Sequence, residues 1–168
     1  MTNAPAIRGG QPRASSSASF DLTVTAQIGR QHVPYLARTL KRALLLVKNA
    51  PAEISVALVN DARMSELHEQ FMNIPGPTDV LTFELDHSPR GRCVSGEIVV
   101  CVPEARRRSR ELKHKLEHEL LLYALHGILH LSGHDDRTES AYRRMHREED
   151  RILTAIGVGA VFSNTKTA

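Results

Sequence analysis

Five side chains of metal-binding type lie within the eleven residues from His126 to Asp136, three histidines and two aspartates. In a helix, His126 and His130 would share one face, one turn apart, so their imidazoles could bind the same ion. Gly133 can adopt a positive φ and end that helix, which lets the chain turn back. A third ligand would then come from Asp136 or His134, since a carboxylate and an imidazole both suit zinc. Three protein ligands with an open fourth position are typical of a catalytic zinc, so this stretch predicts a metal-dependent hydrolase.

Each of these residues also has an interpretation without a metal. A histidine at the edge of an apolar helix is often packed or hydrogen-bonded in the core. Asp136 and Glu139 form an Asp-x-x-Glu pattern, which can cap a following helix. Two histidines four residues apart, followed by a glycine and a further donor, favour metal binding. Both Asp136 and His134 are candidates for the third ligand.

The spacing is similar to that of the metzincin peptidases, which place histidines at the first, fifth and eleventh positions, glutamate second and glycine eighth. His126, His130 and Asp136 occupy the ligand positions here, and Gly133 the glycine position. Gly127 stands where the peptidase has its general base, and a glycine cannot accept a proton. A metallopeptidase is therefore one alternative, and the missing glutamate argues against it.

The same stretch resembles the signature of the YbeY family, His-Gly-x-Leu-His-Leu-x-Gly-Tyr-Asp-His, and agrees with it at nine of eleven positions, counting the free ones. The family block Pro-Thr-Asp-Val-Leu-Ser-Phe is similar to Pro77–Phe83, and the block Gly-Asp-Ile is similar to Gly96–Ile98. The resemblance covers roughly residues 20 to 157, which is nearly all of the expected folded part.

The resemblance implies a zinc-dependent, single-strand-specific endoribonuclease that matures rRNA, including the 3′ end of 16S rRNA, in ribosome assembly and quality control. It implies one zinc per chain, bound by His126, His130 and Asp136, with Asp79, His126 and His130 as catalytic residues. The implied partners are single-stranded RNA or rRNA and the small ribosomal subunit or its proteins. Neither a membrane nor a dinucleotide cofactor is expected.

The chain departs from the family pattern at a few positions. His134 and Asp136 stand where the family usually has tyrosine and a final histidine. Met72 takes the place of the arginine in the usual Asn-x-x-Tyr-Arg, and a thioether cannot neutralise a phosphate. These departures favour a second alternative, a non-catalytic assembly factor in which the metal fixes the fold and a basic face binds RNA or a ribosomal protein.

The positive charge of the chain is modest but concentrated. The net charge is +3 and the pI about 9.1, yet one segment just before the histidines carries six cations: Arg106, Arg107, Arg108, Arg110, Lys113 and Lys115. Such a segment is either a solvated face or a track for a phosphate backbone, which would make binding salt-dependent. We assign its four arginines to RNA binding. Aromatic residues make up 4% of the chain, so backbone contacts are favoured over base stacking.

With glycine at position 127, another group must move the proton during hydrolysis. Asp79, Glu97, His134 and Asp135 are the candidates, although Asp79 could instead cap the end of a strand. Glu119 lies two helical turns before His126, about 10 Å along the axis, which is too far for direct ligation. We expect Glu119 to be solvated or salt-bridged.

Alternation and helical spacing of apolar residues predict an α+β (α/β-like) domain. Strands are expected at 20–26, 53–59, 79–84 and 93–101, and helices at 33–48, 60–71 (with Met64, Leu67 and Phe71 inward), 103–110, 111–131 and 137–156. The long helix over 111–131 and the turn after it would then carry the metal ligands. Together with the resemblance, these elements imply a single domain with a small mixed four-stranded sheet and about five helices.

The ends of the chain and its cysteines complete the prediction. Residues 1–19, rich in Ala, Ser, Gly and Pro, are expected to be a disordered tail, 20–157 the folded hydrolase domain and 158–168 a flexible tail. Cys93 and Cys101 lack CxxC spacing and are expected to be reduced core residues. No run of eighteen apolar residues is present, which excludes a membrane span, and the absence of an apolar signal core predicts a cytoplasmic location.

Overall fold

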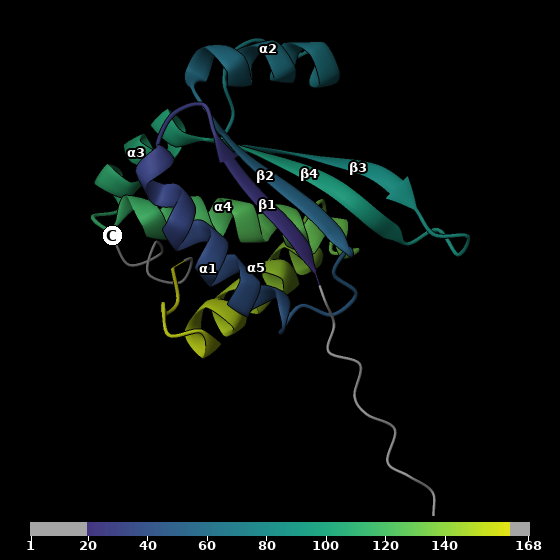
Figure 1. Ribbon diagram of the computed structural model, residues 1–168. Coiled ribbons are helices and arrows are strands. Elements are labelled where there is room, and N and C mark those ends of the chain that lie inside the picture. The colour runs from purple at the N-terminus through teal and green to yellow at the C-terminus, as the bar shows by residue number, and fades with distance from the viewer. Residues whose placement is uncertain (1–19, 162–168) are drawn as a thin grey trace, which may run out of the picture.

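The computed structural model describes residues 20–161 of the chain, which form four strands and five α-helices (Figure 1). The strands are β1 (Asp21–Ala26), β2 (Glu53–Val59), β3 (Val80–His87) and β4 (Cys93–Cys101). The α-helices are α1 (Val33–Leu44), α2 (Asp61–Met72), α3 (Val102–Glu111), α4 (Leu116–Leu131) and α5 (Glu139–Ala155). A short 3-10 helix, η1 (Arg30–His32), precedes α1.

The strands form one mixed sheet in the order β1-β2-β4-β3. β1 and β4 both run parallel to β2, whereas β3 returns antiparallel to β4 and forms an edge of the sheet. The α+β prediction, with a mixed four-stranded sheet and about five helices, is confirmed. Because β3 begins directly after Asp79, the Pro77–Phe83 block lies at the edge where the chain enters the sheet.

The helices cover the two faces of the sheet unequally. α1, α4 and α5 lie on one face and α2 on the other (Figure 1). The large core lies under the three helices, whereas α2 covers a small cluster that includes Met64 and Leu67. The face with the large core therefore holds most of the apolar surface that stabilises the fold.

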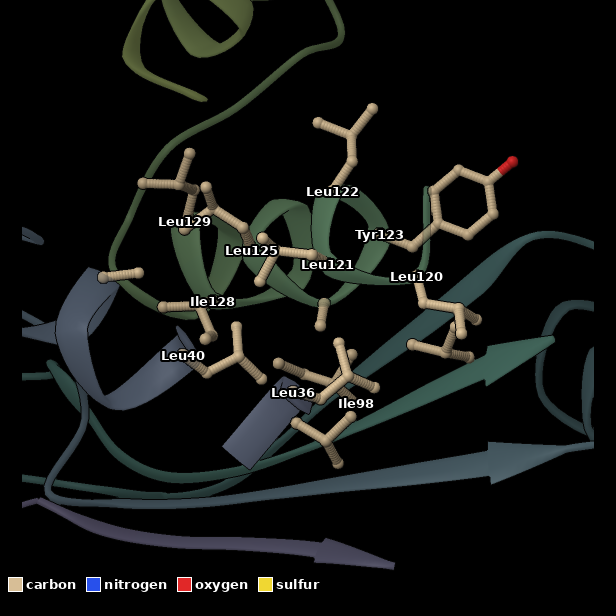
Figure 2. Close-up of a cluster of buried hydrophobic side chains, with 14 of the residues drawn as sticks. Leu36, Leu40, Ile98, Leu120, Leu121, Leu122, Tyr123, Leu125, Ile128 and Leu129 are labelled. Carbon is tan, nitrogen blue, oxygen red and sulfur yellow. The ribbon is translucent and has the colours of Figure 1, made fainter. Parts of the chain in front are cut away.

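α4 is the most deeply buried helix, and its sequence is apolar on nearly every side, as expected for a helix inside a domain. Figure 2 shows Leu121 and Ile128 pointing towards Leu36 and Leu40 of α1, while Tyr123 points away from the sheet. This packing holds α4 rigidly over β4, so side chains on its other side are presented from a fixed position.

The structure corrects several predicted boundaries. The helices expected at 103–110 and 111–131 are separated by residues 112–115, where Lys113 has a φ of 54° and lets α4 reverse against α3. α1 ends at Leu44 rather than at residue 48. Phe71, expected to face inward, is 54% exposed because it lies in the last turn of α2 and contacts the ring of Phe83 at the open side of the sheet.

The end of the described chain is also packed more tightly than expected. Val158 contacts the large core and Val161 is buried in it, so the predicted flexible tail does not begin at residue 158. The expected disordered residues 1–19, and residues 162–168 of the predicted tail, lie outside the described part.

Neither cysteine of the chain is in a disulfide; Cys101 is buried and Cys93 half-buried. Burial raises the pKa of the Cys101 thiol to about 12, which makes it a core residue rather than a nucleophile. Within residues 20–161, none of the helices combines the length and the apolar character needed to cross a bilayer.

Candidate metal centre

Three candidate metal ligands converge at the C-terminal end of α4. His126 and His130 lie one turn apart on this helix, and Asp136 comes from the loop that follows it. Gly133 adopts a φ of 95°, and its amide donates to the carbonyl of His130 while the next amide, of His134, donates to Leu129. This left-handed helix end turns the chain back so that Asp136 faces the two imidazoles.

The distances within this group fit one tetrahedral ion. The Nε2 atoms of His126 and His130 are 3.1 Å apart, and Asp136 Oδ2 lies 3.6 Å from the first and 3.7 Å from the second. Ligand atoms bound to a tetrahedral zinc at about 2.0–2.1 Å lie roughly 3.3–3.4 Å from one another. We call these three residues the donor triangle; zinc bound there would keep its fourth position for water or substrate.

The hydrogen bonds of the two rings leave both Nε2 atoms available to bind a cation. His130 Nδ1 lies 3.1 Å from the carbonyl oxygen of His134, which can only accept, so Nδ1 carries the hydrogen. His126 Nδ1 likewise donates to Glu149 Oε1 at 2.7 Å. Two Nε2 lone pairs therefore point at the same space beside a carboxylate oxygen, and a proton or a metal ion has to lie between them.

Glu149 of α5 is the residue that fixes His126. Its carboxylate is fully buried and accepts hydrogen bonds from Nδ1 of His126 at 2.7 Å and from Nδ1 of His146 at 2.5 Å. Although burial opposes its charge, these two bonds keep the pKa of Glu149 below its usual range. Burial also opposes the charged form of His126, but the hydrogen bond and charge of Glu149 raise the pKa of that ring.

His126, His146 and Glu149 form a second group in which a metal ligand atom from each lies within 4.8 Å of the others. Their contacts of 2.5–2.7 Å are those of hydrogen bonds and are too short for atoms on either side of a bridging ion. Glu149 is thus in the position of a carboxylate partner that orients a candidate metal ligand, His126. The sequence analysis did not identify Glu149, although its position on the same helical face as the apolar Met145 and Ile152 indicates a buried carboxylate.

The structure also separates the two candidates for the third ligand. Asp136 belongs to the donor triangle, whereas His134 contributes its backbone carbonyl to the hydrogen bond from His130. Asp136 does not cap α5, because Thr138 is the N-cap and its Oγ1 accepts from the amide of Ala141 at 3.2 Å. The capping-box interpretation of Asp136 and Glu139 is therefore wrong, and the carboxylate of Asp136 faces the imidazoles instead.

Gly127, at the metzincin base position, lies where α4 packs closely on β3 and β4. A Cβ atom at this position would lie 2.8 Å from Ile98 Cγ2 and 3.0 Å from Thr82 Oγ1. A glutamate has no room at a position that barely admits a methyl group. The packing of α4 against β3 and β4 therefore excludes the peptidase arrangement, and the proton acceptor must come from elsewhere.

We expect Gly127→Ala to destabilise the protein by about 1–2 kcal/mol. Overpacking a close contact typically costs about 1–3 kcal/mol, and a Cβ only 2.8 Å from Ile98 Cγ2 places this substitution in the upper part of that range. The higher helix propensity of alanine offsets about 1 kcal/mol of the cost. Urea unfolding followed by circular dichroism measures the difference. An unchanged or higher free energy of unfolding would show that the strand moves away without strain.

Two cavities flank the donor triangle, and both are lined by Asp79, His126 and Asp136. One, of about 280 Å³, lies between α3, α4 and α5. The other, of about 660 Å³, lies between the end of α2, β3 and the loop after α4, and includes His130. We call them the inner cavity and the outer cavity. Met72, 50% exposed, lines the outer cavity.

Among the predicted proton acceptors, Asp79 is best placed. It lines both cavities, and its Oδ1 accepts from the amide of Val80 at 2.8 Å and from Thr78 Oγ1 at 3.0 Å. It is thus also the strand-terminal cap that was considered. Glu97 lines a separate cavity beside α2, and the exposed carboxylate of Asp135 binds Arg137 at 2.9 Å.

The four predicted RNA-binding arginines are all exposed on α3 but differ in their partners. Arg107 donates to both Asp61 and Glu104. Arg108 is paired with Glu111 and lines the inner cavity, which Arg106 and Arg110 do not. The structure therefore places one of the four arginines in the wall of a cavity that His126 and Asp136 also line.

Comparison with known proteins agrees with this arrangement. The family model described as endoribonuclease YbeY matches residues 21–157. An endoribonuclease YbeY of Acidothermus cellulolyticus is 40% identical over 115 residues, covering 62% of this chain and 70% of the relative. That of Beutenbergia cavernae is 39% identical over 115 residues, covering 64% and 77%. That of Mycobacterium tuberculosis is 38% identical over 114 residues, and this chain spans 64% of its length.

A solution structure of a Thermotoga maritima protein has the same fold. It superposes with a TM-score of 0.57 at 26% sequence identity, covering 80% of this chain and 90% of the other. The family match includes all three residues of the donor triangle, Asp79 and Glu149. With the match extending over nearly every described element, the chain belongs to the endoribonuclease YbeY family.

Proposed function

We propose that this chain is a zinc-dependent endoribonuclease that cleaves single-stranded RNA. The observation that carries the proposal is the donor triangle, in which two imidazole lone pairs and a carboxylate oxygen face one point. The two histidines are 19% and 29% exposed and Asp136 is 33% exposed, so the point they share is open to a substrate. The names of the relatives support RNA as the substrate class.

Five residues at or beside the donor triangle have roles in the proposed hydrolysis. Bound zinc would supply a Lewis acid and lower the pKa of a water ligand to about 7. His126, held by Glu149, and His130, held by the carbonyl of His134, provide the fixed nitrogen donors. Asp79 is placed to accept the proton of the attacking water, because two hydrogen bonds orient its carboxylate at the entrance to both cavities.

The biological setting we propose is rRNA maturation, including the 3′ end of 16S rRNA, with the small ribosomal subunit or its proteins as partners in the cytoplasm. The exposed cations of α3 support binding to a phosphate backbone. A non-catalytic assembly factor is less well supported, because a metal that only fixes the fold has no need of an open fourth position beside an oriented carboxylate.

The test is cleavage of a single-stranded RNA and its duplex by zinc-loaded protein, with Asp79→Asn beside the wild type. We expect the single strand to be cleaved and the duplex spared, and we expect Asp79→Asn to bind zinc normally while cleaving at least about 100-fold more slowly, as for loss of a general base. RNA binding by the zinc-loaded wild type without any cleavage would contradict the proposal and support the assembly factor.

A further inference from the structure

The inner cavity extends from the donor triangle along α4 and contains residues that hydrolysis does not need. Beyond His126, its wall includes Arg108 of α3, Glu119 and Tyr123 of α4, and Tyr142 of α5. Its volume of about 280 Å³ is at the lower end of ligand pockets, which run from about 300 to 1,000 Å³. The cavity therefore suits one small planar group, held next to the group that reacts at the donor triangle.

Glu119 is an unusual residue in such a wall. It was expected to be solvated or salt-bridged, and it is 2% exposed, with its Oε2 2.5 Å from Nε2 of His114. The two atoms are not aligned as a hydrogen bond, and neither has another partner. Burial first, and then the nearby charge and hydrogen bonding of Glu119, raise the pKa of the Tyr123 hydroxyl, and both residues line the same cavity.

A carboxylate has about four lone-pair sites. Oε2 of Glu119 lies against His114 and is closed to solvent, so a group in the cavity that the residue lines has to reach the other carboxylate oxygen. A group that carries a hydrogen-bond donor and enters the cavity would satisfy it. Among parts of RNA, the exocyclic amino groups of bases are such donors.

Arg108 supplies the opposite charge at the same cavity. Its guanidinium is 48% exposed and pairs with Glu111, which is 65% exposed, at 2.9 Å. Exposed pairs of this kind contribute little stability, so a phosphate can replace Glu111 as the partner. The cavity thus offers the carboxylate of Glu119 to an amino group and the guanidinium of Arg108 to a phosphate.

We propose that the inner cavity is a nucleotide subsite in which Arg108 binds a phosphate and Glu119 accepts a hydrogen bond from the amino group of a base. Adenine, cytosine and guanine carry such an amino group and uracil does not. The subsite rests on the proposed function, since it holds the nucleotide next to the cleaved bond. It makes the chain prefer RNA with an amino-bearing base at this position over RNA with uracil.

The first test compares cytidine 5′-monophosphate with uridine 5′-monophosphate by calorimetry on zinc-loaded protein. The two ligands have the same phosphate, sugar and ring size. We expect the cytidine ligand to bind about tenfold more tightly, in line with the discrimination of one base-edge contact, and we expect Glu119→Gln to remove the difference because an amide can serve either base. Equal affinities for the wild type would overturn the proposal.

A second test does not depend on the fold tolerating a change at Glu119. Arg108→Ala should weaken both ligands equally, by about tenfold, and Arg108→Lys should restore part of the loss. Arg110→Ala removes the same charge from the same helix outside the cavity and is the matched control. If Arg110→Ala weakened binding of the monophosphates as much as Arg108→Ala does, the effect would come from the overall positive charge of the helix. The subsite would then be rejected.

Cleavage measured alongside binding separates this inference from the proposed function. RNA cleavage without a difference between the two monophosphates keeps the nuclease and removes the subsite. If the protein prefers the cytidine ligand but cleaves no RNA, the cavity binds nucleotides but the proposed nuclease function is wrong. The subsite has no role in selecting RNA in that case, and the proposal as stated is rejected. Preference together with faster cleavage next to amino-bearing bases supports both.

Discussion

His130→Ala is expected to remove the bound metal and RNA cleavage together. The substitution deletes one of two Nε2 donors that face the same point and leaves an imidazole and a carboxylate, which are too few ligands for a stable zinc site. Without zinc, the pKa of the attacking water stays far above neutral pH instead of falling to about 7, so we expect the cleavage rate to fall by at least about 10³-fold. Metal analysis after dialysis and cleavage of a labelled single-stranded RNA measure the two effects.

The matched control for this experiment is His134→Ala. It removes an imidazole four residues away, but the backbone carbonyl that accepts from His130 Nδ1 remains. We expect this variant to bind one zinc per chain and to cleave RNA, and we expect Asp136→Ala to lose zinc. The opposite pattern, with zinc retained by Asp136→Ala and lost by His134→Ala, would mean that the loop rearranges on metal binding and that His134 is the third ligand.

Glu149→Gln is expected to weaken metal binding by about 10- to 100-fold, or about 1.4–2.7 kcal/mol. The carboxylate accepts from Nδ1 of two imidazoles, whereas an amide has one accepting oxygen and a donating nitrogen that would oppose the second ring. His126 would lose part of its orientation and of the charge that favours cation binding. Competition with a chromogenic chelator measures the affinity without relying on activity.

Glu148→Gln is the control for this prediction, because it makes the same chemical change at the next residue of α5. Glu148 pairs with Arg151 on the surface and has no contact with the donor triangle. We expect its zinc affinity to match the wild type. If Glu149→Gln also matched the wild type, the buried carboxylate would serve only to hold α5 against α4.

The ligands of the candidate metal centre could be predicted from the sequence, because they lie close together in the chain. The spacing of His126 and His130 and the glycine after them require only helical geometry and a left-handed helix end, both of which the structure has. The four strands were placed within a few residues, and the first two show the alternating burial that their sequences predict. Short-range rules were sufficient for these features.

Long-range contacts were not readable in the same way. Glu149 is 23 residues from His126 in sequence, and its role follows only from the packing of α5 on α4. Asp136 is free to face the imidazoles because Thr138 takes the N-cap of α5, whereas the sequence offered Asp136 with Glu139 as the capping pattern. Likewise, only Arg108 of the four arginines lines the inner cavity, and this depends on the turn at 112–115, which sets the orientation of α3 relative to α4.

The donor triangle spans only eleven residues of the chain, and this has a thermodynamic consequence. An unfolded chain keeps its three ligands within a short loop, whose closure costs little entropy. The unfolded state therefore retains part of the zinc affinity, and ligand binding to the unfolded state reduces the stabilisation that mass action gives to the folded one. Zinc should therefore raise the melting temperature less than its affinity for the native protein would suggest. The stabilisation that remains depends on the extra zinc affinity that Glu149 provides once α5 packs on α4.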